Sequence, residues 1–176
     1  MGLVYLCLRD WGCMGKTDRL LIERLAIEDV FARYAHTADG YDAEGWVGCY
    51  TEDGIFEIKI DDNRIQFVGR LALLDFIHAH IRLLPGTRHV MTNHLVDIEG
   101  ERATHRCTLA GMLSRPDKVY TFISGWYEST LEKVKGEWKI KHRIVHVDNG
   151  TNFIEGELAV HIKPFMEWMV VNGTIA

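Results

Sequence analysis

The sequence predicts an α+β fold in which a curved, mixed or antiparallel sheet packs against N-terminal helices as a cone. Two observations lead to this class. Helical patterns come first in the chain, and four strand-like runs then follow one another from residue 87 onward. Consecutive strands after helices are typical of α+β domains. A bent sheet closed by helices has a hollow interior, so we expect it to enclose an apolar pocket.

The length and composition of the chain fit one globular domain. The chain has 176 residues, of which 47% are hydrophobic, so it can bury a sizeable core. Its net charge is −5 and it has no run of Lys or Arg, which argues against nucleic acid as a partner. No stretch approaches the ~18 apolar residues of a membrane span. We therefore expect a cytoplasmic protein that does not enter a membrane.

The cysteines and the first residues of the chain bear on the expected cellular location. The chain has four cysteines and no CxxC pair: Cys7, Cys13, Cys49 and Cys107. We interpret them as reduced thiols rather than a disulfide framework or a zinc site. Residues 1–15 are expected to form a weakly ordered extension, with Met14 as an alternative start. They resemble a signal peptide only superficially, because Arg9 interrupts the apolar run and no cleavage site follows.

Helical periodicity predicts three helices in the first half of the chain. The first begins near Thr17, a possible N-cap, and stops at Gly40. Its apolar residues form one buried stripe, namely Ile27, Val30, Phe31, Tyr34 and Ala38. A short second helix is expected to start at Asp42 and to end in the turn "TEDG". The third, "RLALLDFIHAHIRLL", ends before "PG".

Alternating apolar residues predict the strands. "GIFEIKI" and "IQFVG" form a hairpin around the turn "DDNR". Four longer strands then follow: "TRHVMTNHLVDI", "RATHRCTLAGML", "VYTFISGWYESTL" and "EWKIKHRIVHVD". We assign residues 16–150 to the cone domain and 151–176 to a C-terminal tail. The tail has helical spacing, and Pro164 is expected to break its helix.

Asp39 is a candidate for chemistry because it lies where a carboxylate is costly. The helix macrodipole disfavours negative charge at a helix C-terminus, and the flank of the buried stripe disfavours it again. Both effects are expected to raise its pKa. Such a carboxylate is a candidate general base or an orienting partner for a histidine; the alternative is a solvent-exposed turn residue. Asp42 is better explained as the N-cap of the second helix.

His89 opens the first long strand. Strand alternation places it on one face with Met91 and Asn93, and places His94 on the other face. An aspartate bound to a histidine fixes the imidazole tautomer and raises its basicity, which makes a proton-abstracting dyad. A structural histidine is the alternative. Spacing alone does not establish that Asp39 and His89 meet.

Several motifs together resemble the SnoaL-like branch of the nuclear-transport-factor-2-like superfamily. They are "AIEDVFARYAHTADGYDAEGW", "YTEDGIFEI", "FVGRLALLDFI", "TRHVMTNHLVDIEGERAT" and "GEWKIKHRIV", in this order, over about residues 18 to 150. The branch includes hexachlorocyclohexane dehydrochlorinase, scytalone dehydratase and bile-acid 7α-dehydratase. The resemblance implies a cone fold and a lyase activity without a cofactor.

The resemblance also implies site residues. The catalytic pair of these lyases falls on Asp39 and His89, the pocket tyrosine on Tyr34, and the arginine that assists the leaving group on Arg143. The further acidic residue of the bile-acid enzyme falls on Gly111, so that group is missing here. Our candidate substrate-binding residues are Tyr50, Phe56, Met91, Phe122 and Trp126. For Phe122 and Trp126, which share one predicted sheet face, core packing is the alternative.

No metal or cofactor is expected. His78 and His80 lie 200° apart on a helix, so they do not ligate one ion, and we expect both to face solvent. His142 and His146 share a strand face that can meet another subunit, and Arg143 points to the opposite face. The sequence has no phosphate loop and no GxSxG motif.

The sequence thus favours a cofactor-independent lyase, a dehydratase or dehydrohalogenase acting on a small, hydrophobic, cyclic molecule. The alternatives are a non-catalytic ligand-binding or assembly module of the same fold, or isomerase-like or epoxide-opening chemistry in the same pocket. Apolar residues on the outer sheet face lead us to expect a homo-oligomer, and the resemblance suggests a trimer or dimer. The substrate and the leaving group stay open.

Overall fold

The computed structural model describes residues 15–148 and 156–175. Most of the expected N-terminal extension, with Cys7 and Cys13, lies outside the described residues. The elements in chain order are α1 (Lys16–Asp39), α2 (Ala43–Val47), β1 (Tyr50–Ile60), β2 (Asn63–Val68), α3 (Gly69–Leu83), β3 (Thr87–Glu99), β4 (Arg102–Ser114), β5 (Val119–Val134), β6 (Glu137–Val147), η2 (Gly156–Leu158), α4 (Ala159–Asn172) and β7 (Thr174–Ile175).

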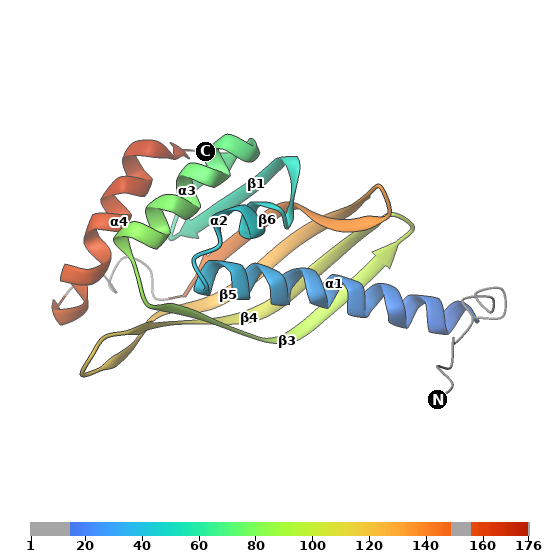
Figure 1. The fold of residues 1–176 in the computed structure, drawn as a ribbon, viewed down its shortest axis with the longest axis horizontal. Coiled ribbons are helices and arrows are strands. Elements are labelled where there is room, and N and C mark those ends of the chain that lie inside the picture. The colour runs from blue at the N-terminus through green and yellow to red at the C-terminus, as the bar shows by residue number, and fades with distance from the viewer. Residues whose placement is uncertain (1–14, 149–155, 176) are drawn as a thin grey trace, which may run out of the picture.

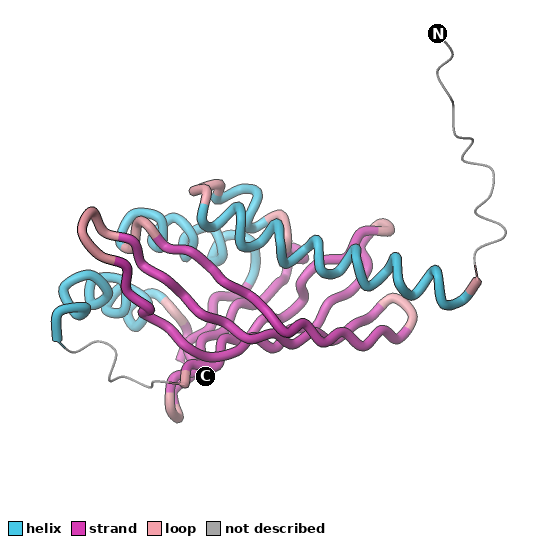
Figure 2. The backbone as a smooth tube through the Cα atoms, turned by 90° about the horizontal axis from the view of Figure 1, so that it is seen from below, coloured by secondary structure: helices cyan, strands magenta, loops and turns pink. Residues whose placement is uncertain are grey.

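The predicted α+β class is confirmed. The seven strands form one mixed sheet in the order β3-β4-β5-β6-β1-β2-β7, in which only the β1–β6 pair is parallel. Figure 1 shows α1 running along the strands β3 to β5, with α3 and α4 side by side at the other end of the sheet. Figure 2, turned by 90°, shows the bend of the strands beneath the helices. The core fills the space between them.

The stripe predicted for α1 is the buried one: Ile27, Val30, Phe31, Tyr34 and Ala38. Its N-cap is Gly15 rather than Thr17, and the Gly15 N–H donates to the Asp18 carboxylate at 3.1 Å. At the other end the Gly40 N–H donates to the carbonyl of His36 at 2.9 Å. The helix therefore ends with Asp39 as its last residue.

Asp42 caps α2 as expected, since its Oδ1 accepts from the Gly45 N–H at 2.8 Å. The predicted turn "TEDG" is wrong, because β1 already begins at Tyr50 and includes these four residues. Tyr50 pairs with Ile140 of β6, and the register shifts between Tyr50 and Ile55. The irregular stretch is thus a bulged part of the strand, which hides the alternation in the sequence.

The predicted break at Pro164 is also wrong, since α4 continues through this residue. A proline inside a helix costs about 3 kcal/mol. The apolar side chains of Ile162, Phe165 and Met169 are buried by α4, and burial of each stabilises by about 1.5–3 kcal/mol, which offsets this cost. The last residues of the chain then pair with β2 as strand β7.

Two further β-bulges, in β3 and β5, affect which side chains face the helices. In β3 the register shifts between Thr92 and Leu95, and Asn93 has a positive φ of 58°. In β5, Gly111 of β4 pairs with Ile123 while Met112 pairs with Thr121, so one extra residue, Phe122, stands between them. A bulge moves every following side chain to the other face of its strand.

Candidate functional site

A cavity of about 70 Å³ lies between the concave face of the sheet and the helices. Residues of α1, α2, α3, α4 and of five strands line it, and nearly all are aliphatic or aromatic. Four lining side chains carry a hydroxyl or an imidazole: Tyr34, His80, His89 and Tyr127. An apolar cavity with a few converging polar groups is the usual form of a small-molecule site.

The structure brings Asp39 into contact with His89, which lines this cavity. Asp39 Oδ1 lies 2.7 Å from His89 Nδ1, and Asp39 Oδ2 accepts from the backbone N–H of His89 at 3.0 Å. Both side chains are largely buried, with exposed fractions of 14% and 13%. One carboxylate therefore fixes both the backbone and the ring of His89.

The end of α1 is tied to β3 by a further contact. Arg88 Nη1 donates to the backbone carbonyl of Asp39 at 3.0 Å. A cation near a helix C-terminus is favourable, and this bond satisfies a carbonyl that α1 leaves without a partner. The placement of Asp39 opposite His89 thus depends on two neighbouring residues of β3.

The expected rise in the pKa of Asp39 is wrong. Burial does raise this pKa, but hydrogen bonds and the charge of His89, with a contribution from Arg88, outweigh it, so the pKa lies below the ordinary value. The helix-end argument considered only repulsive influences and missed the partners on β3. Asp39 is therefore a carboxylate at neutral pH, which suits an acceptor for the Nδ1–H of His89.

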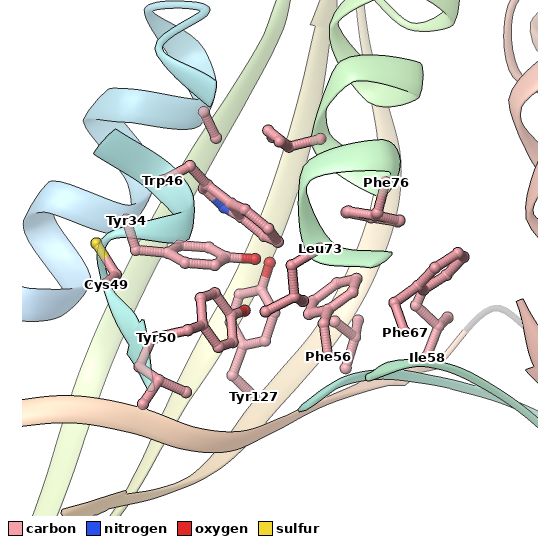
Figure 3. Packing of buried hydrophobic residues seen from close by; sticks show 14 of the residues in the cluster. Tyr34, Trp46, Cys49, Tyr50, Phe56, Ile58, Phe67, Leu73, Phe76 and Tyr127 are labelled. Atoms are coloured by element: carbon pink, nitrogen blue, oxygen red, sulfur yellow. The ribbon is translucent and has the colours of Figure 1, made fainter. Parts of the chain in front are cut away.

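Tyr34 lies beside the dyad, with its ring centroid 6.0 Å from that of His89. Figure 3 shows the hydroxyls of Tyr34 and Tyr127 pointing toward the same interior space, next to Trp46. Burial raises the pKa of Tyr34, and the lowering effects of the Arg143 charge and of hydrogen bonding with Tyr127 do not cancel it. Tyr34 is thus a neutral phenol that can donate a hydrogen bond.

Arg143 does not line the cavity, contrary to its expected contact with a leaving group. Its guanidinium carbon lies 3.5 Å from the ring centroid of Tyr127 and 4.3 Å from that of Tyr34, and both rings line the cavity. Its Nη1 donates to Ser129 Oγ at 3.0 Å. Within residues 15–148 and 156–175 it forms no ion pair with a carboxylate. The aromatic rings stabilise this buried charge through cation–π contacts.

Met91 and Tyr50 also lie outside the cavity lining. Met91 shares the inner face with His89, but its sulfur turns under α1, where Arg143 Nη2 lies 3.1 Å from it. The Tyr50 ring packs against Tyr34 and Trp46, with centroids 6.3 and 5.0 Å apart (Figure 3). Met91 and Tyr50 therefore pack against residues around the site and do not line the cavity themselves.

Of the aromatic candidates, Phe56 and Phe122 line the cavity and Trp126 does not. Trp126 stacks on His146 with ring centroids 3.6 Å apart, on the face opposite to Tyr127. The shared face predicted for Phe122 and Trp126 is wrong because the bulge at Phe122 lies between them.

The expected solvent exposure of His80 is wrong as well: it is 7% exposed and lines the cavity. The 200° separation from His78 places one of the two histidines on the buried side of α3. The signal was present in the sequence, since Leu73, Phe76, Ile77 and His80 follow the i, i+3, i+4, i+7 pattern of a buried stripe. The cavity lining also includes Tyr127 and Gly111, which pairs with His89 across the β3–β4 ladder.

A second group of polar side chains lies under α1. The bulge at Asn93 turns His94 toward His105 and Cys107, and possible ligand atoms of these three lie within 4.8 Å of one another. The residues fit a metal ion poorly. His94 Nδ1 and His105 Nε2 already bond at 2.9 Å. A cation there would leave the proton on the buried His105 Nδ1, which has no partner among the described residues, and would lie in the field of Arg143.

The fold and the cavity define a cone-shaped α+β protein with an apolar cavity between its sheet and its helices. A family model of the SnoaL-like domain matches residues 19–144. The chain therefore belongs to the SnoaL-like family.

Solved structures agree with this assignment. A variant of Rv3472, a protein of unknown function from Mycobacterium tuberculosis, is 33% identical, with a TM-score of 0.81 over 93% of this chain and 98% of that one. A candidate scytalone dehydratase from Novosphingobium aromaticivorans is 25% identical, with a TM-score of 0.64 over 74% and 87%. An NTF2-like protein with a cystatin-like fold from the same organism is 24% identical, with a TM-score of 0.69 over 82% and 100%.

No match emerges among curated proteins. In the part of the chain that the structure describes, no helix is both long and apolar enough to cross a membrane.

Proposed function

We propose that this protein is a cofactor-independent lyase that eliminates water or a halide from a small, largely apolar, cyclic molecule. The observation that carries the proposal is the contact of Asp39 with His89, a residue that lines a largely apolar cavity. Elimination needs a positioned base and a site from which the substrate displaces water, and the imidazole of His89 and the apolar lining support this reaction.

His89 is the proposed base. Because Asp39 accepts from Nδ1–H, we assign the free lone pair to Nε2. Nε2 takes a proton from a substrate carbon, the C–H electron pair forms the new double bond, and the leaving group departs with its own electron pair. Asp39 stabilises the imidazolium that forms. The same proton can then pass to a departing hydroxide, which gives water.

Tyr34 is the proposed hydrogen-bond donor to the leaving group or to a developing oxyanion. Arg143 is assigned a positioning role, since Tyr34 and Tyr127 line the cavity and it does not. Burial raises the pKa of both phenols, and the positive charge of Arg143 partly offsets this rise, which makes them stronger hydrogen-bond donors. Isomerase-like or epoxide-opening chemistry would use the same groups, and product analysis separates these reactions from elimination.

A second candidate function is a non-catalytic ligand-binding or assembly module. The size of the cavity favours it: 70 Å³ is less than half of the ~150 Å³ that holds benzene in an engineered protein cavity. A one-ring substrate therefore requires the walls to move. Met166 and Met169 of α4 line the cavity, and such unbranched, polarisable side chains adapt readily to a ligand.

The test begins with a thermal-shift screen of hydroxylated and halogenated alicyclic compounds, steroids and polyketides. Turnover of the compounds that bind is then measured in the wild type and in His89→Ala and Asp39→Asn. We expect both variants to lose turnover while their circular dichroism spectra stay unchanged. His78→Ala, on the same molecule but outside the cavity, is the matched control and keeps full activity. Full activity of either dyad variant would end the proposal, and binding without turnover in the wild type would favour the binding module.

A further inference from the structure

His80 is a polar residue of the cavity lining that has no role in the proposed elimination. It comes from α3, on the opposite side from α1, and its ring centroid lies 6.0 Å from that of His89. Phe76 and Phe165 surround it, with centroid distances of 6.4 and 5.3 Å. The imidazole of His80 thus lies among apolar lining residues, close enough to His89 for one small ligand to contact both rings.

This imidazole is poorly satisfied by the protein. Its Nδ1 is buried and has no hydrogen-bond partner among the residues that the structure describes. Burial lowers the pKa of His80 to about 3, with a smaller lowering effect from His89, so the ring is neutral at physiological pH. A neutral imidazole has one donor and one acceptor nitrogen.

An unsatisfied buried polar group costs about 1–3 kcal/mol, so natural proteins rarely retain one without a partner. The cavity has room for water, which needs only about 10–15 Å³. A ligand that displaces such a water gains affinity only if it replaces the hydrogen bond. A hydroxyl or carbonyl oxygen does so, whereas a carbon-bound halogen accepts hydrogen bonds weakly and donates none.

We propose that His80 is a specificity-determining residue that binds an oxygen atom of the ligand, so that the pocket selects oxygenated alicyclic compounds over halogenated ones. The inference rests on the cavity of the proposed lyase and makes dehydration, rather than dehydrohalogenation, its reaction. It places the ligand oxygen on the α3 side of the cavity and the reacting C–H beside His89.

Cyclohexanol and chlorocyclohexane are suitable probes, because they differ in one substituent. Their dissociation constants are measured by NMR titration with wild type, His80→Phe and His78→Phe. Phenylalanine keeps the ring shape of His80 and removes its polar atoms. Because His80→Phe removes one hydrogen bond to the ligand oxygen, we expect the preference for cyclohexanol to fall about two- to tenfold in this variant. The exposed-side control, His78→Phe, keeps the wild-type preference.

A spectroscopic measurement on the wild type needs no folded variant. In protein with ¹⁵N-labelled histidine, cyclohexanol should shift the ring nitrogen resonances of His80, and chlorocyclohexane should not. His80→Asn, which retains a donor and an acceptor, should keep the preference. Equal preferences in wild type and His80→Phe, unshifted resonances, or no saturable binding of cyclohexanol would each overturn the inference.

These outcomes are separate from the test of the lyase. The binding preference does not depend on turnover, so inactive dyad variants should retain it. Conversely, rapid turnover of halogenated compounds that His80→Phe leaves unchanged would remove the role of His80 and leave the proposed Asp39–His89 base intact.

Discussion

At the scale of single residues, the Asp39 carboxylate links the chemistry of the site to the stability of the fold. It joins the last residue of α1 to both the backbone and the ring of His89. A hydrogen bond to a charged group contributes about 1.5–3 kcal/mol, so replacing Asp39 affects more than the proposed reaction.

The lowered pKa of Asp39 predicts a pH dependence. Because the folded-state pKa lies below the ordinary value of 3.8, the ionised carboxylate stabilises the protein fully above about pH 5. This contribution is lost as the pH falls through the folded pKa. Asp39→Asn should therefore lower the free energy of unfolding by about 1.5–3 kcal/mol at pH 7 and by less at pH 3. Urea titrations across this range check it, and a pH-independent difference would contradict it.

The candidate site was only partly readable from its residues. The resemblance to known lyases led to Asp39 and His89, and the structure brings them together. The predicted exposure of His80 is wrong because it rests on the separation of the two histidines in "HAH" and not on the apolar stripe of their own helix, which includes His80. Arg143 lies on the predicted strand face, opposite to His142. The sequence does not tell how far its side chain lies from the cavity, and the rings of Tyr34 and Tyr127 stand between them.

At the scale of elements, the bulges determine which strand residues face the cavity. Helix stripes, caps and strand positions follow from local patterns, which is why α1, α2 and α3 and the strands were largely predictable. A bulge adds one residue at a point that alternation does not mark. Trp126 and His94 were therefore assigned to the wrong faces, although their strands were correct.

The bulge in β3 predicts a specific effect of substitution at Asn93. This residue has a φ of 58°, a conformation that asparagine tolerates and a β-branched residue does not. Asn93→Val should lower the free energy of unfolding by about 1–2 kcal/mol. Asn93→Gly is the control and should cost less, because glycine adopts positive φ freely. The Asn93 side chain also donates from Nδ2 to Thr108 Oγ1 at 3.3 Å, and both variants remove this bond. Equal losses in urea denaturation would show that the bond, and not the backbone, is responsible.

At the scale of the whole molecule, apolar residues remain exposed on the outer side of the sheet. Val90 and Leu95 of the edge strand β3 are 42% and 58% exposed. An edge strand with free backbone groups and apolar side chains is a natural place for another subunit. We expect a dimer or trimer, with two or three times the monomer mass in sedimentation velocity experiments. A monomer at micromolar concentration would contradict this expectation.

The α+β class was predictable because helical patterns dominate the first half of the chain and four consecutive strands, β3 to β6, follow them. The contribution of the last segment was not. A proline in an apolar stretch suggested a broken tail, whereas α4 packs on α3 (Figure 1) and supplies lining residues to the cavity. Local preference was overridden by tertiary burial, which a pattern within one segment does not reveal.

The position of α4 in the chain has a consequence for biosynthesis. The proposed catalytic pair has been translated once β3 has left the ribosome, but one wall of the cavity belongs to α4, which is translated after all the strands that line the cavity. Until α4 is made, the apolar interior stays open to solvent, and nascent chains with such surfaces tend to bind chaperones or to aggregate. A message truncated just before α4 would thus yield a polypeptide that contains Asp39 and His89 but lacks the helix that closes the cavity beside them.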